Sequence, residues 1–402
     1  MNRFFKKFIE RFIEGILFLS SSVTTLTVLL IVVFLFREGL GVFKQTPVEQ
    51  EFAIVINKNN SVKEITSPQL KNIFDQNITN WSALGGKNDS ILLFRIDDIG
   101  NYFTEEQLGD SLQYMPKCLS TLVDSLSGII AFIPEKYVDK NFAGHTLPLE
   151  KIKLSKFLSG KEWFPTAQPA AQLGVLPLIL GTFWVSLGAI LFALPFGIAA
   201  AIYMAEIANE KVRKVLKPMI ELLAGIPSVV FGFFGLIIVV PMIQRLFDLP
   251  VGETALAGSI ILGIMALPTI ITISEDAIRT TPRAMKEASL ALGATHWQTI
   301  YKVILPYSIS GISAAIILGV GRAIGETMAV LMVTGNAAVI PHTILEPVRT
   351  IPATIAAELG EAPQGGLHFK ALFALGCILF ILTMAINLLV EFISTRRKYN
   401  KR

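Results

Sequence analysis

The sequence predicts an all-α polytopic membrane protein of six transmembrane helices with a small inserted α/β domain. Of its 402 residues, 52% are hydrophobic and only 16% are charged, against about 25% charged in soluble domains. The charge is missing from several long blocks, which is typical of membrane spans. Basic clusters lie beside these blocks, as the preference for cations on the cytoplasmic side predicts.

The first apolar block covers residues 15–36 and follows a basic start. It is long enough to cross a bilayer and longer than the apolar part of a cleaved signal peptide. We therefore expect residues 1–45 to form a cytoplasmic N-terminus and a retained first transmembrane helix.

Residues 46–170 mix charges, asparagines and turn residues, which predicts an extracytoplasmic α/β insert. Apolar runs predict strands at 52–56, 91–96 and 129–133. Ser67 is expected to cap a helix that runs to Phe74, because its hydroxyl can accept an amide that the helix leaves unpaired.

Residues 171–402 are expected to form the membrane core. The five further apolar blocks cover residues 173–205, 222–244, 254–274, 303–333 and 371–390. Counted from a cytoplasmic start, this places every basic cluster and the C-terminus in the cytoplasm, and the insert outside.

Several function classes are disfavoured by what the sequence holds. The basic runs beside spans fit the positive-inside rule better than nucleic-acid binding. Cys118 and Cys377 are expected not to meet, and the cysteines and four histidines show no metal-site spacing. We find no Gly-x-x-x-x-Gly-Lys-Ser/Thr loop and no nucleophile motif. No catalytic, cofactor or metal site is predicted.

The loop 282–306 carries the most specific motif. Residues 283–292 predict an amphipathic helix, and Gly293 fits the left-handed position that ends one. The loop resembles the coupling motif of ABC-importer permeases, in which Glu-Ala-Ala, Gly and Leu-Pro recur at this spacing. The resemblance implies that this loop docks an ATPase, through residues Glu287, Ala288, Gly293, Trp297, Leu305 and Pro306.

Residues 224–232 and 319–329 narrow the resemblance to the PstC-type permease subunits of phosphate ABC importers. That family implies a type I permease fold in the bacterial inner membrane and ATP hydrolysis on a separate chain. It also implies three kinds of partner: a second permease subunit in a heterodimer, an ATPase dimer and an extracytoplasmic phosphate-binding protein. The transported substrate would be phosphate.

Arg322 and Glu326 stand four residues apart in the fifth span and are expected to share a helix face and to touch. At about 24 Å past Pro306 they lie inside the bilayer. The pair is either a structural ion pair or, as the resemblance implies, part of a phosphate pathway with Thr327. Gly321 and Gly325 predict a close-approach strip for another helix beside it.

Within the insert, residues 65–86 and 128–137 resemble parts of soluble phosphate-binding proteins. Arg95 and Asp97 match that family's phosphate-binding stretch, but Ile99 and Asn101 stand where hydroxyl donors are expected. We expect a single-lobe relative that has lost phosphate binding, with Arg95 and Asp97 paired. Its role would be docking or regulation at the outer mouth, or merely a stabilising cap.

Two alternatives remain at this point. One is a permease for another oxyanion, such as molybdate or sulfate. The other is a membrane receptor or scaffold with a sensing outer domain. The coupling motif favours a transporter, because a receptor has no need of an ATPase-docking helix.

Overall fold

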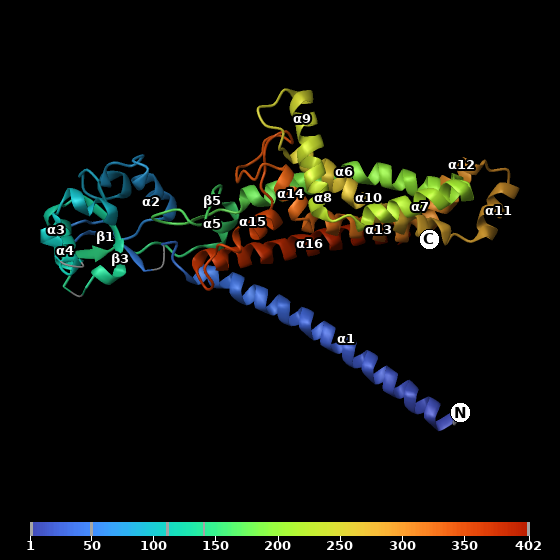
Figure 1. Cartoon of the computed structure of the whole chain (residues 1–402), viewed down its shortest axis with the longest axis horizontal. Helices are drawn as coiled ribbons and strands as arrows, with labels where there is room; N and C mark the ends of the chain where they lie inside the picture. Colours follow the sequence, from blue (N-terminus) through green and yellow to red (C-terminus); the bar gives the residue numbers. More distant parts are fainter. Residues whose placement is uncertain (1–2, 49–50, 110–111, 140, 400–402) are drawn as a thin grey trace. The chain divides into compact units, whose positions relative to one another are not determined.

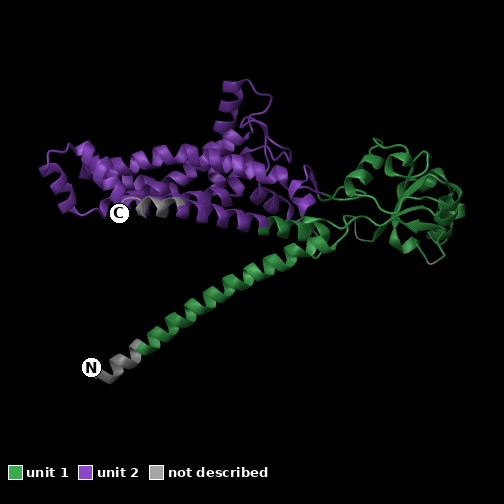
Figure 2. Ribbon diagram, turned by 180° about the vertical axis from the view of Figure 1, so that it is seen from behind, with its two compact units in different colours: residues 1–154, 165–172, 363–377 green, residues 155–164, 173–362, 378–402 purple. Residues whose placement is uncertain are grey.

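The computed structural model describes residues 3–48, 51–109, 112–139 and 141–399. Two compact units divide the chain, as Figure 2 shows. Unit 1 comprises residues 1–154, 165–172 and 363–377, and unit 2 comprises residues 155–164, 173–362 and 378–402.

The α-helices and strands follow in chain order (Figure 1). They are α1 Arg3–Leu40, β1 Phe52–Asn57, α2 Ser67–Phe74, β2 Leu92–Arg95, α3 Glu105–Leu108, α4 Met115–Ser125, β3 Ile129–Pro134, β4 Gly144–Thr146, α5 Leu154–Ser159, β5 Trp163–Phe164, β6 Gln172–Leu173, α6 Leu176–Ile202, α7 Glu210–Gly225, α8 Ser228–Phe234, α9 Val240–Phe247, α10 Ala255–Arg279, α11 Arg283–Ala291, α12 His296–Thr299, α13 Leu305–Gly325, α14 Met328–Val333, α15 Ile351–Glu358 and α16 Leu367–Tyr399.

Three π-helical segments extend or join these helices. They are η6 at Tyr203–Ile207, η7 at Gly235–Val239 and η8 at Ile300–Ile304. Short 3-10 segments lie at η1 Gly41–Lys44, η2 Trp81–Leu84, η3 Ile96–Asn101 and η5 Glu135–Tyr137.

The prediction of six spans is confirmed. Among the described residues, six helical stretches are long and apolar enough to cross a membrane. They are Arg11–Lys44, Leu176–Ile207, Ser228–Phe247, Ala255–Arg279, His296–Gly325 and Leu367–Phe392.

Unit 1 contains a four-stranded sheet of order β2-β3-β1-β4. β1 runs antiparallel to β3 and β4, and β2 runs parallel to β3. Ala131 of β3 lies between Val55 of β1 and Phe94 of β2. The three expected strands are therefore present, with β4 added at an edge.

Both faces of this sheet are covered, which explains why β1 reads as an unbroken apolar run. Ile54 and Ile56 pack with α2 on one face. Ala53 and Val55 pack with Leu119 of α4 on the other. The sheet is thus the middle layer of a small α/β domain.

The start of α2 corrects one expectation. The capping residue is Thr66 and not Ser67, which is already helical. Thr66 and Gln69 form a reciprocal capping box, in which the Thr66 amide donates to Gln69 Oε1 at 2.9 Å. Pro68 stands in the first turn, where its missing amide costs nothing.

Unit 1 also holds a close crossing of α1 with the start of α16. A Cβ added at Gly39 would lie 2.8 Å from Cys377 Sγ, and one at Gly376 would lie 2.9 Å from Leu35. The Cys377 thiol donates to the Leu35 carbonyl at 3.4 Å. The two glycines therefore permit a backbone approach that larger residues would block.

Unit 2 is built around α10, the most buried of the six spans. α6 and α13 pack along it, again through small residues. Gly188 of α6 faces Ser259, and Gly311 of α13 would place a Cβ only 2.3 Å from Ala277 Cβ. The core of this unit is continuous from α6 through α10 to α14.

Two expected spans are shorter than the sequence indicated. The third begins at Ser228, because Pro227 forces Ile226 into an extended conformation (φ −70°, ψ 128°) and separates α7 from α8. The fifth ends at Gly325, and the apolar residues beyond it form the separate helix α14.

Gly311→Ala tests the α10–α13 crossing. The added methyl group has no room against Ala277, and overpacking of this kind costs about 1–3 kcal/mol. We expect a lower melting temperature of the purified protein in detergent.

Gly321→Ala on the same helix is the matched control, because nothing lies within 4 Å of its Cβ position. It should leave the melting temperature unchanged or raise it, since alanine favours helix. Equal effects of the two substitutions would contradict the tight crossing.

Candidate functional site

The apolar block 303–333, which the sequence predicted to be one span, is broken after Gly325. α13 ends at Gly325, Glu326 is extended (φ −71°, ψ 134°), and α14 starts at Met328. A break of this kind leaves backbone groups without helical partners, and lipid cannot satisfy them. It is therefore typical of segments that line a protein-enclosed or water-filled path.

Arg322 stands one turn before the break. Its guanidinium donates to Thr269 Oγ1 of α10 at 3.5 Å. The expected contact with Glu326 is wrong: in the part of the chain that the structure describes, no ion pair joins them. The reason is local, since a spacing of four residues places two side chains on one face only while the helix continues.

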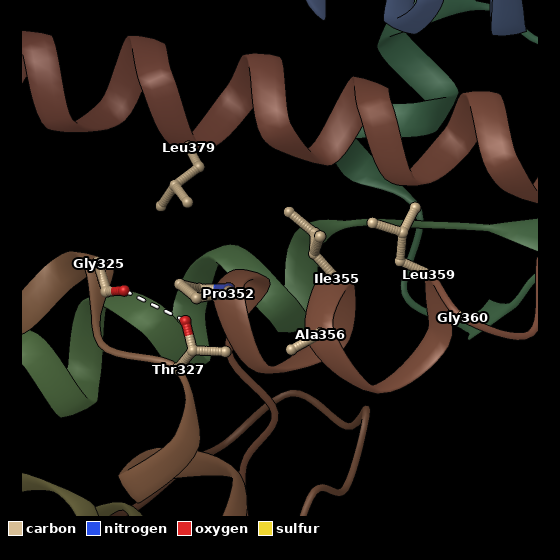
Figure 3. Close-up of a pocket in the computed structure, with 8 residues that line it drawn as sticks. All are labelled: Gly325, Thr327, Pro352, Ile355, Ala356, Leu359, Gly360 and Leu379. Carbon is tan, nitrogen blue, oxygen red and sulfur yellow. Dashed lines mark hydrogen bonds between the residues drawn. The ribbon is translucent and has the colours of Figure 1, made fainter. Parts of the chain in front are cut away.

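Thr327 lies at an open pocket of about 470 Å³, which Figure 3 shows with Leu379 of α16 above the other lining residues. Its hydroxyl donates to the carbonyl of Gly325 at 3.3 Å. The other lining residues are mostly apolar: Pro352, Ile355, Ala356, Leu359, Gly360 and Leu379. The break thus opens on a cavity of this unit.

Gly321 and Gly325 make no close contact with another helix among the described residues. A Cβ built at either position would meet nothing within 4 Å. The expected close approach of another helix is therefore not seen within this chain and stays a prediction, and this side of α13 leaves room for a neighbouring molecule. Arg322 directly follows Gly321 in the sequence, and Glu326 and Thr327 directly follow Gly325 at the break.

The loop after α10 forms α11 and α12, and Gly293 ends α11 as expected. Gly293 has φ +86°, its amide donates to Leu290 O at 2.9 Å, and the Ala294 amide donates to Ser289 O at 3.2 Å. These two bonds make a Schellman motif with glycine at the left-handed position. The sequence prediction for this turn is confirmed.

The remaining loop residues that the motif singled out divide into two groups. Glu287, Ala288 and Trp297 are exposed, Trp297 by 63%. Leu305 and Pro306 are half-buried and begin α13, which follows η8. The first group offers a surface to another molecule, while the second joins the loop to the membrane core.

A buried carboxylate was missed by sequence reasoning. Glu275, near the end of α10, is fully buried and lies 2.9 Å from Arg213 Nε. Lys217 Nζ is 3.4 Å and Arg279 NH1 is 3.6 Å away from its two oxygens. The signal was available in part, since Arg213 and Lys217 stand four apart and so share one face of α7.

Lys217 also approaches Asp276, at 3.4 Å. Burial lowers the pKa of the Lys217 ammonium, but the neighbouring carboxylates of Glu275 and Asp276 outweigh this and hold the pKa above its ordinary value. Lys217 is therefore cationic at neutral pH, and α7 is fixed to α10 by charge.

In the insert, the stretch after β2 folds as η3 instead of a helix N-terminus for an anion. Ile99 packs against the domain core, together with Ile96. The guanidinium of Arg95 lies over the ring of Phe74, 5.4 Å from its centre. Arg95 and Asp97, which we expected to pair, form no ion pair among the described residues.

Comparison with known proteins gives two family matches. Residues 193–399 match the family described as binding-protein-dependent transport system inner membrane component. Residues 37–178 match the family described as PBP superfamily domain.

Relatives match over most of their own length. The probable ABC transporter permease protein YqgH of Bacillus subtilis (strain 168) is 39% identical over 281 residues, which cover 70% of this chain and 89% of that protein. The phosphate transport system permease protein PstC of Mesorhizobium japonicum is 36% identical over 274 residues, or 63% and 82% of the two chains. Among solved structures, a chain of the methionine ABC transporter MetNI in an inward-facing conformation is 21% identical with a TM-score of 0.42, over 56% of this chain and 94% of that chain.

Proposed function

Because the chain belongs to the family of binding-protein-dependent transport system inner membrane components, we propose that it is the PstC-type permease subunit of an ATP-driven phosphate importer. It forms half of the translocation path and takes no part in ATP hydrolysis, which belongs to a separate ATPase chain. The observation that carries the proposal is the exposed α11–Gly293–α12 turn beside the ends of the spans. Relatives named as phosphate permeases support the choice of phosphate.

The site residues have distinct proposed roles. Arg322, Glu326 and Thr327 contact phosphate at the break between α13 and α14. A guanidinium offers a fork of donors suited to phosphate oxygens. The break itself frees backbone groups that can face a transported ion. Glu287, Ala288, Gly293 and Trp297 contact the ATPase, and Leu305 and Pro306 pass its movement into α13.

The partners and topology complete the proposal. A second permease subunit faces the open side of α13 at Gly321 and Gly325. An ATPase dimer binds from the cytoplasm, and a phosphate-binding protein delivers substrate from outside. The N-terminus, which leads into the first transmembrane helix within residues 1–45, and the C-terminus of the 171–402 core are assigned to the cytoplasmic side, and the 46–170 insert to the outside.

Substitution of the pathway residues tests the function directly. Arg322→Gln should lower uptake of radiolabelled phosphate by proteoliposomes of the assembled importer at least tenfold, because it removes the cation and its donors. Glu326→Gln should also lower uptake, without reducing the melting temperature, since Glu326 balances no charge on Arg322. Thr269→Ala should have a smaller effect, as it removes only a long hydrogen bond.

Competition decides the substrate in the same assay. Excess phosphate should abolish uptake, while sulfate and molybdate should not. If Arg322→Gln and Glu326→Gln both take up phosphate at the wild-type rate, these two residues are not part of the phosphate pathway. If sulfate or molybdate blocks uptake, the transported substrate is another oxyanion and not phosphate.

Gly293→Val tests the coupling turn. Valine is strained at φ +86° and should distort the Schellman motif that sets the direction of α12. We expect normal membrane insertion, weaker copurification of the ATPase and lower uptake. The control is Gly365→Val, because this exposed glycine also has a left-handed φ (+77°) and no neighbour within 4 Å of its Cβ position, but lies outside the coupling loop and the Thr327 pocket. Normal ATPase binding and uptake by Gly293→Val would contradict the assignment.

We propose further that the insert does not bind phosphate and serves docking or regulation at the outer mouth. Ile99 offers no donor, and each unmade hydrogen bond to a buried oxyanion costs about 1–3 kcal/mol. Titration calorimetry of the purified full-length chain should therefore detect no micromolar phosphate binding. A micromolar dissociation constant that is lost on Arg95→Ala would show a working receptor domain instead.

A further inference from the structure

The helix α11 is attached to the membrane core by very few side chains. Lys286 and Ser289 are its half-buried residues, and the others are exposed. They stand three apart and so lie on one face of the helix. None of the apolar side chains of α11 is buried. The polar contacts of Lys286 and Ser289 are therefore the best-defined side-chain links through which movement of α11 can reach the spans.

The first contact is an ion pair with the second span. Lys286 Nζ lies 2.5 Å from Glu206 Oε1, and the Glu206 side chain is only 6% exposed. Glu206 belongs to η6, the π-helical end of α6. A π segment changes the direction of the side chains that follow it relative to a regular helix. Glu206 thereby joins a loop residue to a span that lies 80 residues earlier in the sequence.

The second contact leads to a different span. The hydroxyl of Ser289 lies 2.9 Å from that of Thr299, the last residue of α12. Thr299 is followed by η8 and then by α13, so this contact stays within the same continuous segment. The ends of α6 and α10 pack together with η8, which leads into α13, through Ala201, Ile278 and Ile300. Among the described residues of α11, Lys286 is thus the one with an ion pair to a span outside its own segment.

We propose that the Glu206–Lys286 ion pair makes α6 follow the movement of α11 during transport. Both residues act as positioning residues: neither touches phosphate or ATP. Separating the pair would leave a nearly buried carboxylate without its cation, which is strongly unfavourable, so the two elements move together. The inference rests on the proposed function, because it assigns to α11 the contact with the ATPase.

The test uses the assembled importer in proteoliposomes, with ATP hydrolysis and phosphate uptake measured on the same samples. Glu206→Gln and Lys286→Gln remove the charge attraction and keep the size of each side chain. We expect each to lower uptake at least fivefold, while ATPase copurification and the rate of hydrolysis stay within twofold of the wild type. The ratio of phosphate taken up to ATP hydrolysed should fall accordingly.

Exchanging the two charges tests whether the attraction between residues 206 and 286 matters, or only the identity of each side chain. Glu206→Lys combined with Lys286→Glu should restore uptake to within twofold of the wild type. Lys286→Arg, which keeps the cation, should also transport normally. The charge-matched controls are Glu210→Gln and Lys211→Ala, because both side chains are exposed on α7 and enter none of the ion pairs among the described residues. Both controls should transport like the wild type.

The proposal is overturned if the single variants keep the wild-type ratio of uptake to hydrolysis, or if the reversed pair transports no better than the single variants. If the protein with the reversed pair does not insert into the membrane, uptake by Lys286→Arg is compared with uptake by Lys286→Gln instead. Equal uptake by those two variants would then overturn it.

A measurement that does not depend on the transported substrate tests this inference independently of the proposed function. Leu318→Cys, with Cys118 and Cys377 replaced by serine, places a thiol on the exposed side of α13 that also holds Gly321 and Gly325. In the protein that keeps the Glu206–Lys286 ion pair, trapping the ATPase with ATP and vanadate should change the rate at which a water-soluble maleimide labels this thiol. Lys286→Gln should abolish that change. If the wild type imports no phosphate, the proposed substrate is wrong. Loss of the labelling change in Lys286→Gln would still support the proposed role of the ion pair. A labelling change that persists in Lys286→Gln would overturn that role.

Discussion

The hydrocarbon interior of the bilayer decides most of this structure, because it leaves no partner for an unpaired backbone amide or carbonyl. Five of the six spans therefore cross the apolar region with their hydrogen bonds made inside helical segments. The exception is the stretch from Gly325 to Met328, where α13 stops and α14 begins. That exception coincides with Arg322, Glu326 and an open pocket. The irregular backbone therefore lies beside a cavity of this unit.

The spans, the insert and the coupling turn could be predicted because each leaves a local signal. Charge-free blocks indicate helices that cross the membrane, and the unbroken apolar run of β1 indicates a strand buried on both faces. Gly293 could be placed from the helix pattern before it. In each case the information lies within a few turns of the chain, and the structure agrees with it.

The rest depends on contacts between distant segments. The break after Gly325 has no proline and no polar run to announce it, so residues 303–333 read as a single helix. Thr269 reaches Arg322 from another span, and Glu275 is neutralised from α7. In the insert, the sequence indicated that Ile99 could not donate to an anion. It did not indicate that Arg95 would lie over Phe74 instead of pairing with Asp97.

The charge cluster around Glu275 also has a consequence for the order in which the helices enter the membrane. A carboxylate that is fully buried near the end of a span is costly until cations reach it. Arg213 and Lys217 belong to α7, which leaves the ribosome before α10. The counter-charges of α7 are therefore already present in the chain when Glu275 is synthesised. The chain order of the two helices makes the insertion of α10 depend on a segment synthesised earlier, and a fragment starting after α7 would carry that carboxylate with only Arg279 and none of the α7 cations to balance it.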